Sequence, residues 1–93
     1  MDTKKLKAAR DATTAAYQLE IDASQALAIL LVTAQRAATN DSAAHEAYRA
    51  VSADYNASCK RLSVLAEKFE RACERYDEAI AADKAFARAM AKA

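Results

Sequence analysis

Histidine, cysteine and acidic side chains are the residues of this chain that could do chemistry, and they are sparsely placed. His45 is the only histidine, and Asp41 stands one helical turn before it, so the pair could donate two ligands to a metal ion. The surrounding sequence offers no third ligand, and the chain has no Glu-x-x-His or His-Glu-x-x-His motif. We therefore interpret His45 as a solvent-facing residue beside a helix cap, and we expect neither a metal nor another cofactor.

The two cysteines, Cys59 and Cys73, could act as nucleophiles or form a disulfide. A nucleophilic thiol needs a base, and His45 would lie roughly 21 Å from Cys59 on one helix. The cysteines are fourteen residues apart, so they share a helix face at a distance that no intrachain bridge spans. An antiparallel dimer centred near Ala66 could pair them, but two small packing residues are the simplest interpretation. We expect no enzyme activity and no small-molecule substrate.

The absence of glycine and proline from all 93 residues indicates which elements must position these side chains. Without glycine the chain cannot form a phosphate-binding loop of the Walker or dinucleotide type. Without either residue it lacks the usual means of making tight turns and stopping helices. Alanine, the strongest helix former, fills 27 positions. The composition therefore predicts one small all-α domain over residues 1–93.

Four short polar residues at 39–42, Thr-Asn-Asp-Ser, form the only clear break in the helical sequence. Such side chains compete for backbone hydrogen bonds, and Asn40 can take the left-handed conformation that glycine usually supplies. We predict a helix over about 3–38, a turn at 39–42 and a second helix over about 42–89. The expected caps are the polar residues at the start of each helix, Asp2 or Thr3 for the first and Asp41 or Ser42 for the second.

Apolar side chains in the second half recur at alternating spacings of three and four, as at the a and d positions of a heptad repeat. A further row at intervals of seven makes the stripe wide enough for a helical bundle. The first row is Tyr48, Val51, Tyr55, Ser58, Leu62, Leu65, Phe69, Ala72, Tyr76 and Ala79, and the further row is Cys59, Ala66, Cys73, Ile80 and Ala87.

The first half carries a less regular stripe of smaller residues. In the same register its first row is Leu6, Ala9, Thr13, Ala16, Glu20, Ala23, Leu27, Leu30, Ala34 and Ala37, and its second is Tyr17, Ser24, Leu31 and Ala38. The small residues would let another helix approach closely. The segment 27–32 is apolar on nearly every side, and a helix that is apolar all round is normally surrounded. A lone hairpin would leave one side of it wet, which predicts an oligomer or a bound partner.

These patterns predict a long antiparallel helical hairpin that assembles into a helical bundle or coiled coil. The second helix would outlast the first and leave the region after about Phe69 without an intramolecular partner. This region carries Tyr76, Ile80, Phe86 and Met90, which are unfavourable in water, so it could pack on another copy, bind another protein, or fold back near Asp83 as a short third helix. One unbroken helix is conceivable because the heptad register continues across the turn, but Asp41 at a core position argues against it.

The large apolar and aromatic residues of these stripes form the predicted interaction surface, because aromatic residues are enriched where proteins associate. Its members are Leu27, Leu31, Tyr48, Tyr55, Leu62, Leu65, Phe69, Tyr76, Ile80 and Phe86.

The function that we favour is that of a non-enzymatic interaction protein. It would self-associate as an antiparallel homodimer and so form a four-helix bundle. The alternative is a small inhibitor or adaptor, from a phage or mobile element, that docks on a larger host enzyme complex.

Charge and hydropathy limit the remaining function classes. The 14 basic and 13 acidic residues give a net charge of +1, far from the balance of a strongly basic nucleic-acid binder. The weak nucleic-acid candidates are Lys4, Lys5, Lys7 and Arg10, for which a solvated first turn is the simpler interpretation.

The apolar run at 26–32 is too short for a membrane span, and no signal peptide follows Met1. We therefore expect a cytoplasmic protein without membrane contact.

Overall fold

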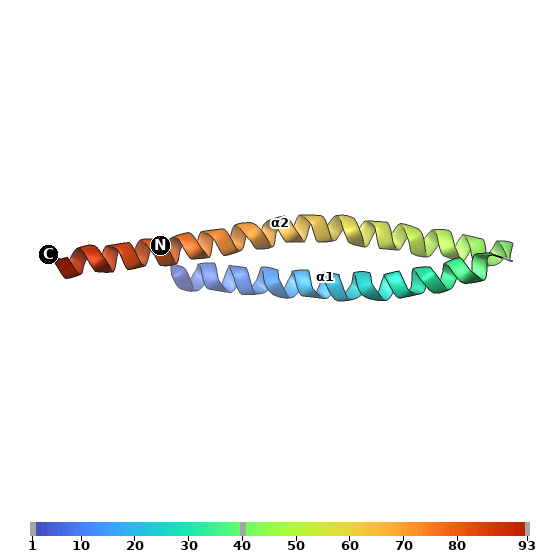
Figure 1. Cartoon of the computed structure of the whole chain (residues 1–93), viewed down its shortest axis with the longest axis horizontal. Coiled ribbons are helices and arrows are strands. Elements are labelled where there is room, and N and C mark those ends of the chain that lie inside the picture. Colours follow the sequence, from blue (N-terminus) through green and yellow to red (C-terminus); the bar gives the residue numbers. More distant parts are fainter. Residues whose placement is uncertain (1, 40, 93) are drawn as a thin grey trace.

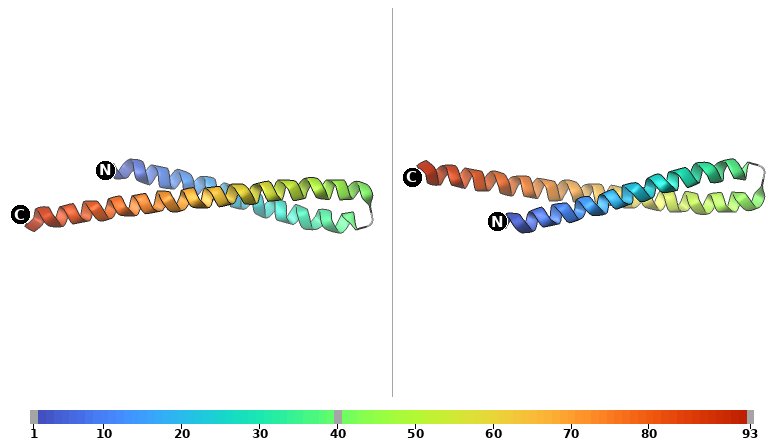
Figure 2. Two further views of the ribbon diagram at one scale, coloured as in Figure 1. Left: turned by 90° about the horizontal axis from the view of Figure 1, so that it is seen from above. Right: turned by 90° about the horizontal axis from the view of Figure 1, so that it is seen from below.

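Two long helices make up the computed structural model, which describes residues 2–39 and 41–92. Helix α1 spans Thr3–Ala38 and helix α2 spans Ser42–Lys92. The helices lie side by side and antiparallel (Figure 1), and they cross each other near the middle of α1 (Figure 2). The molecule is a rod of 78 × 15 × 15 Å. The predicted all-α hairpin is confirmed, and the alternative of one unbroken helix is wrong.

Polar side chains cap both helices where the sequence predicts them. The Asp2 carboxylate accepts hydrogen bonds from the backbone N–H groups of Lys4 and Lys5, at 3.1 and 3.3 Å. The Asp41 carboxylate accepts one from the backbone N–H of Ala43 at 3.0 Å. These bonds satisfy first-turn amides that have no partner within the helix. The left-handed conformation expected of Asn40 lies outside the described residues.

The seam, meaning the contact between the facing sides of α1 and α2, uses the predicted stripe of α2. Every member of both predicted rows from Tyr48 to Ile80 is buried or half-buried, and only Ala87 is exposed. Ser58 and Ala79 are fully buried. The heptad spacing of the second half therefore predicted the inward face of α2 correctly.

The seam of α1 contains only part of the predicted stripe, which divides into sets of residues that repeat every seven positions. Ala9, Ala16, Ala23, Leu30 and Ala37 are exposed, whereas Arg10, Tyr17, Ser24, Leu31 and Ala38 are half-buried against α2. Each of these two sets lies beside a third set, Leu6, Thr13, Glu20, Leu27 and Ala34, which is half-buried in the seam. Helix α2 could therefore lie on either side of this third set. It lies on the side of Tyr17 and Leu31, where larger side chains bury more apolar surface than alanine can.

The unpaired end of α2 is shorter than the sequence predicts. The Phe69 ring packs on the Tyr17 ring with centroids 5.7 Å apart, and the Arg10 guanidinium lies 4.3 Å above the Tyr76 ring. The side chains at 81–92 are all exposed, and this segment, the overhang, extends past the start of α1 (Figure 1). The short third helix is wrong, because α2 continues through Asp83 to Lys92 in a segment rich in alanine.

Candidate interaction surfaces

A polar cluster joins the two helices at the middle of the seam. The Ser58 hydroxyl donates a hydrogen bond to Glu20 Oε1 at 2.7 Å, and Arg61 Nε donates to the same oxygen at 2.9 Å. Both donors favour the ionised carboxylate, and together they hold the pKa of Glu20 below its ordinary value. The sequence placed Glu20 and Ser58 on facing stripes, but their pairing was missed because it depends on the register of the hairpin.

The large side chains predicted to form the interaction surface mostly hold the hairpin itself together. Nine of the ten are half-buried in the seam: Leu27, Leu31, Tyr48, Tyr55, Leu62, Leu65, Phe69, Tyr76 and Ile80. A hydrogen bond with the neighbouring Cys59 thiol raises the pKa of Tyr55. Phe86, the tenth, is on the overhang and is 69% exposed. What remains open to a partner is therefore elsewhere on the helices.

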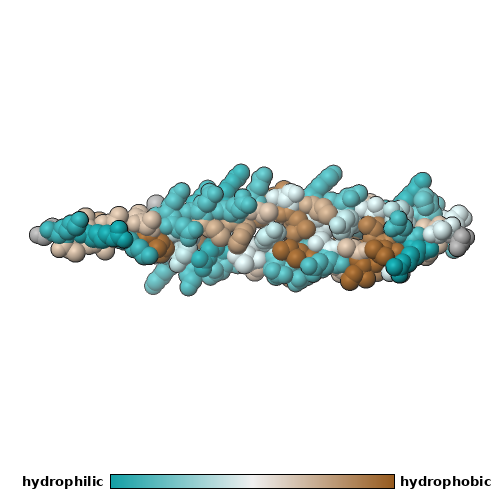
Figure 3. Space-filling model, viewed as in Figure 1, coloured by the Kyte–Doolittle hydropathy of each residue, from teal (hydrophilic) through white to brown (hydrophobic). Residues whose placement is uncertain are grey.

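A second apolar face runs along α1 about 100° around the helix from the seam. We call this face the outer stripe: Ala12, Ala16, Leu19, Ala23, Ala26, Leu30, Thr33 and Ala37, all of them exposed. Its spacing alternates between four and three residues, and it contains no charge. Leu19 and Leu30 are 71% and 54% exposed. Figure 3 shows hydrophobic surface along α1 toward the turn.

The signal for the outer stripe was present in the sequence but was assigned to the wrong neighbour. Ala16, Ala23, Leu30 and Ala37 were placed on the stripe that would contact α2. In the structure they belong to the open face. A helix with apolar residues on two faces about 100° apart suits the corner of a four-helix bundle, where each helix contacts two neighbours.

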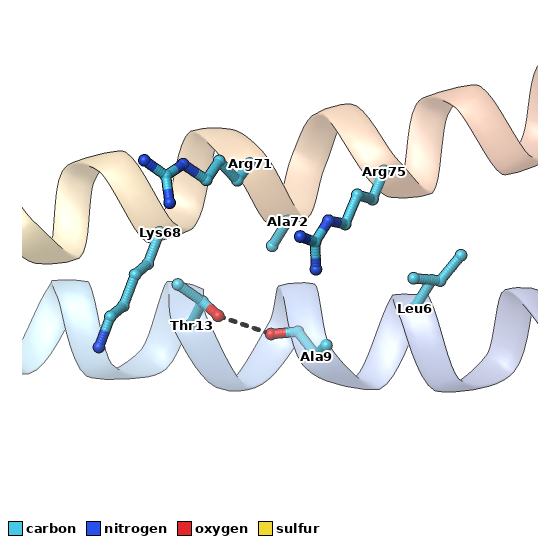
Figure 4. Close-up of a pocket in the computed structure, with 7 residues that line it drawn as sticks. All are labelled: Leu6, Ala9, Thr13, Lys68, Arg71, Ala72 and Arg75. Carbon is cyan, nitrogen blue, oxygen red and sulfur yellow. Dashed lines mark hydrogen bonds between the residues drawn. The ribbon is translucent and has the colours of Figure 1, made fainter.

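A shallow hollow of about 290 Å³ opens between the first half of α1 and the middle of α2. Its lining consists of Leu6, Ala9, Thr13, Lys68, Arg71, Ala72 and Arg75. Figure 4 shows Lys68 and Arg75 reaching toward α1 on either side of Thr13, whose hydroxyl donates to the Ala9 carbonyl at 2.7 Å. Glu67 pairs with Arg71 at 3.8 Å. The positive charges of the other two basic lining residues, Lys68 and Arg75, could attract an acidic side chain of a partner.

The basic start of α1 separates into exposed and engaged residues. Lys4, Lys5 and Lys7 are exposed, as a solvated first turn requires. Arg10 is half-buried over Tyr76 and also pairs with Asp11 at 3.2 Å. Its guanidinium therefore belongs to the seam and would have to leave Tyr76 to contact a phosphate.

The residues considered for metal binding or nucleophilic chemistry are far from assembling a site. His45 is exposed and stacks on Tyr48 with ring centroids 6.1 Å apart. Cys59 and Cys73 are half-buried free thiols on α2. Over residues 2–39 and 41–92, no three or more His, Cys, Asp or Glu side chains gather closely enough to hold a metal ion.

Neither helix, over the part of the chain that the structure describes, combines the length and hydrophobicity of a membrane span. The open surfaces described above, which are the outer stripe, the hollow lined by Lys68, Arg71 and Arg75, and the overhang, are all formed by helix faces. Comparison with known proteins adds no assignment to them: no family model, no curated protein and no solved structure matches this chain.

Proposed function

We propose that this chain is a non-enzymatic interaction protein that acts by self-association through an apolar helix face. The observation that carries the proposal is the surplus of surface. The hairpin exposes 6992 Å², whereas a compact monomer of 10.0 kDa exposes about 5,200 Å². The surplus of about 1,800 Å² is roughly twice the 800 Å² that each partner buries in a standard interface.

The distribution of exposed side chains supports the same proposal. Leu19, Ile29 and Leu30 are 71%, 70% and 54% exposed, and all three are on α1. Burying one such side chain contributes about 1.5–3 kcal/mol, so covering several of them could offset the entropy lost on association. A second hairpin would supply that cover as a four-helix bundle, and a net charge of +1 per copy opposes this only weakly.

A structural role for the polar residues is consistent with the non-enzymatic part of the proposal. Glu20 forms hydrogen bonds across the seam, and its Oε1 atom already accepts from both Ser58 and Arg61. We place the protein in the cytoplasm as part of this proposal. Its two thiols are free, as is usual in a reducing compartment.

Concentration-dependent stability tests self-association. Because dimer stability includes the association free energy, we expect the Tm measured by circular dichroism to rise steadily between about 1 and 100 µM protein. A fully helical protein whose cooperative Tm is the same at every concentration would contradict the proposal.

The overhang supports a second candidate function, docking on a larger protein. Phe86 and Met90 are 69% and 62% exposed and stand one helical turn apart, as do the anchors of helices that bind in grooves. In this role the chain would be a small inhibitor or adaptor, from a phage or mobile element, acting on a host enzyme complex. Capture of a host complex by the wild type, but not by a Phe86→Ala/Met90→Ala variant, is the expected result. Recovery of only this chain would count against it.

A further inference from the structure

The outer stripe of α1 reads the same in both directions along the helix. From Ala12 to Ala37 its residues are small, small, Leu, small, then small, Leu, small, small. The midpoint lies between residues 24 and 25, so that Leu19 and Leu30 are equidistant from it, as are Ala23 and Ala26. A twofold interface requires such a self-complementary surface, because each residue of one copy meets its symmetric counterpart on the other.

We infer that a second copy of this chain packs its α1 antiparallel on the outer stripe, with the twofold axis between residues 24 and 25. This inference rests on the proposed function and specifies its interface. Leu19 of one copy then packs against Leu30 of the second copy, and Ala23 against Ala26 of the second copy. The alanines at the centre allow the helices to approach to about 8 Å, the close end of the usual range.

Charge complementarity favours the antiparallel orientation. The twofold axis places the start of α1 of one copy at the level of the end of α1 of the second copy. The same axis places the basic first turns of α1 beside Asp41 at the turn of the other copy. A parallel pairing would instead bring the two lysine-rich starts together, which is unfavourable.

The area available on the hairpin is sufficient for this dimer. The hairpin as a whole exposes a surplus of about 1,800 Å², which exceeds what one partner buries in a standard interface. In the inferred alignment the turn of the second copy reaches the level of about residue 9, so it ends before the overhang begins. Phe86 and Met90 therefore stay open in the dimer, and docking through the overhang is compatible with it.

A charge-exchange experiment tests the interface and its orientation together. Leu19→Glu alone and Leu30→Lys alone place a charge against leucine of the second copy, and each should raise the dimer Kd by about 100-fold. The double variant, Leu19→Glu with Leu30→Lys, pairs the new carboxylate with the new ammonium across the twofold axis. It should recover the dimer to within about tenfold of wild type. Both leucines are exposed on the surface of a single hairpin, so the variant monomers should keep their helicity.

Val32→Glu is the matched control, because Val32 is 49% exposed on α1 but roughly 150° around the helix from the outer stripe. It should leave the dimer Kd within about threefold of wild type. A dimer that survives both single variants overturns the inference and leaves the proposed function standing. A double variant that stays dissociated overturns the antiparallel alignment, because a parallel pair would oppose like charges. A wild type that is monomeric overturns the proposed function itself.

Discussion

Glu20, Ser58 and Arg61 show how single residues set the alignment of two long helices. Alanine-rich helices can slide past one another at little loss of packing, because neighbouring small side chains are nearly equivalent. A half-buried carboxylate that accepts from Ser58 at 2.7 Å and Arg61 at 2.9 Å has no equivalent partners one turn away. The group therefore selects one register, a role documented for single polar residues in coiled coils.

Acid should weaken the hairpin through this group. The pKa of Glu20 is lowered in the folded chain, chiefly by the Ser58 hydrogen bond and then by Arg61, so the unfolded chain binds a proton first as the pH falls. The stabilisation is complete above the ordinary carboxyl pKa of about 4.5 and is lost as the pH drops through the folded value. We expect the free energy of unfolding, measured in urea, to decline from about pH 6 toward pH 3.

Glu20→Gln should flatten part of that decline, because glutamine does not titrate. Glu67→Gln is the matched control, since Glu67 pairs only with the exposed Arg71 on its own helix at 3.8 Å. It should leave the decline close to wild type. Identical pH profiles for the wild type and Glu20→Gln would refute the role of the cluster.

At the scale of the helices, the accuracy of sequence reasoning depended on side-chain size. The caps and bounds of α1 and the inward face of α2 were predictable, because Tyr48, Leu62 and Phe69 mark one side of α2 unambiguously. On α1 the rows containing Ala16 and Tyr17 both satisfy heptad spacing, so periodicity alone could not choose between them. The choice depends on contacts with α2, as does the pairing of Glu20 with Ser58.

The level at which α1 starts divides α2 into a packed part and the overhang, and two phenylalanines report on this division. Phe69→Ala removes a half-buried ring that packs on Tyr17, so it should lower the free energy of unfolding by about 1–2 kcal/mol, less than for a fully buried ring. Phe86→Ala is the matched control and should change it by under about 0.5 kcal/mol, because its ring is 69% exposed. Equal losses at the two positions would mean that the overhang is packed.

At the scale of the whole molecule, the hairpin is too thin to bury a core of its own. Among the described residues only Ser58 and Ala79 are fully buried, and the rod is 15 Å thick in two directions. Its radius of gyration is 21.4 Å, against about 12 Å for a compact domain of this length. Small domains with so little buried surface are normally stabilised by association.

Sedimentation equilibrium of the wild type, between about 1 and 100 µM, tests self-association most directly. We predict a mass that rises toward twice the 10.0 kDa of one chain, with Leu19→Glu remaining near the monomer mass and Val32→Glu following the wild type. A mass of one chain at every concentration, in a sample that circular dichroism shows to be fully helical, would contradict the central claim.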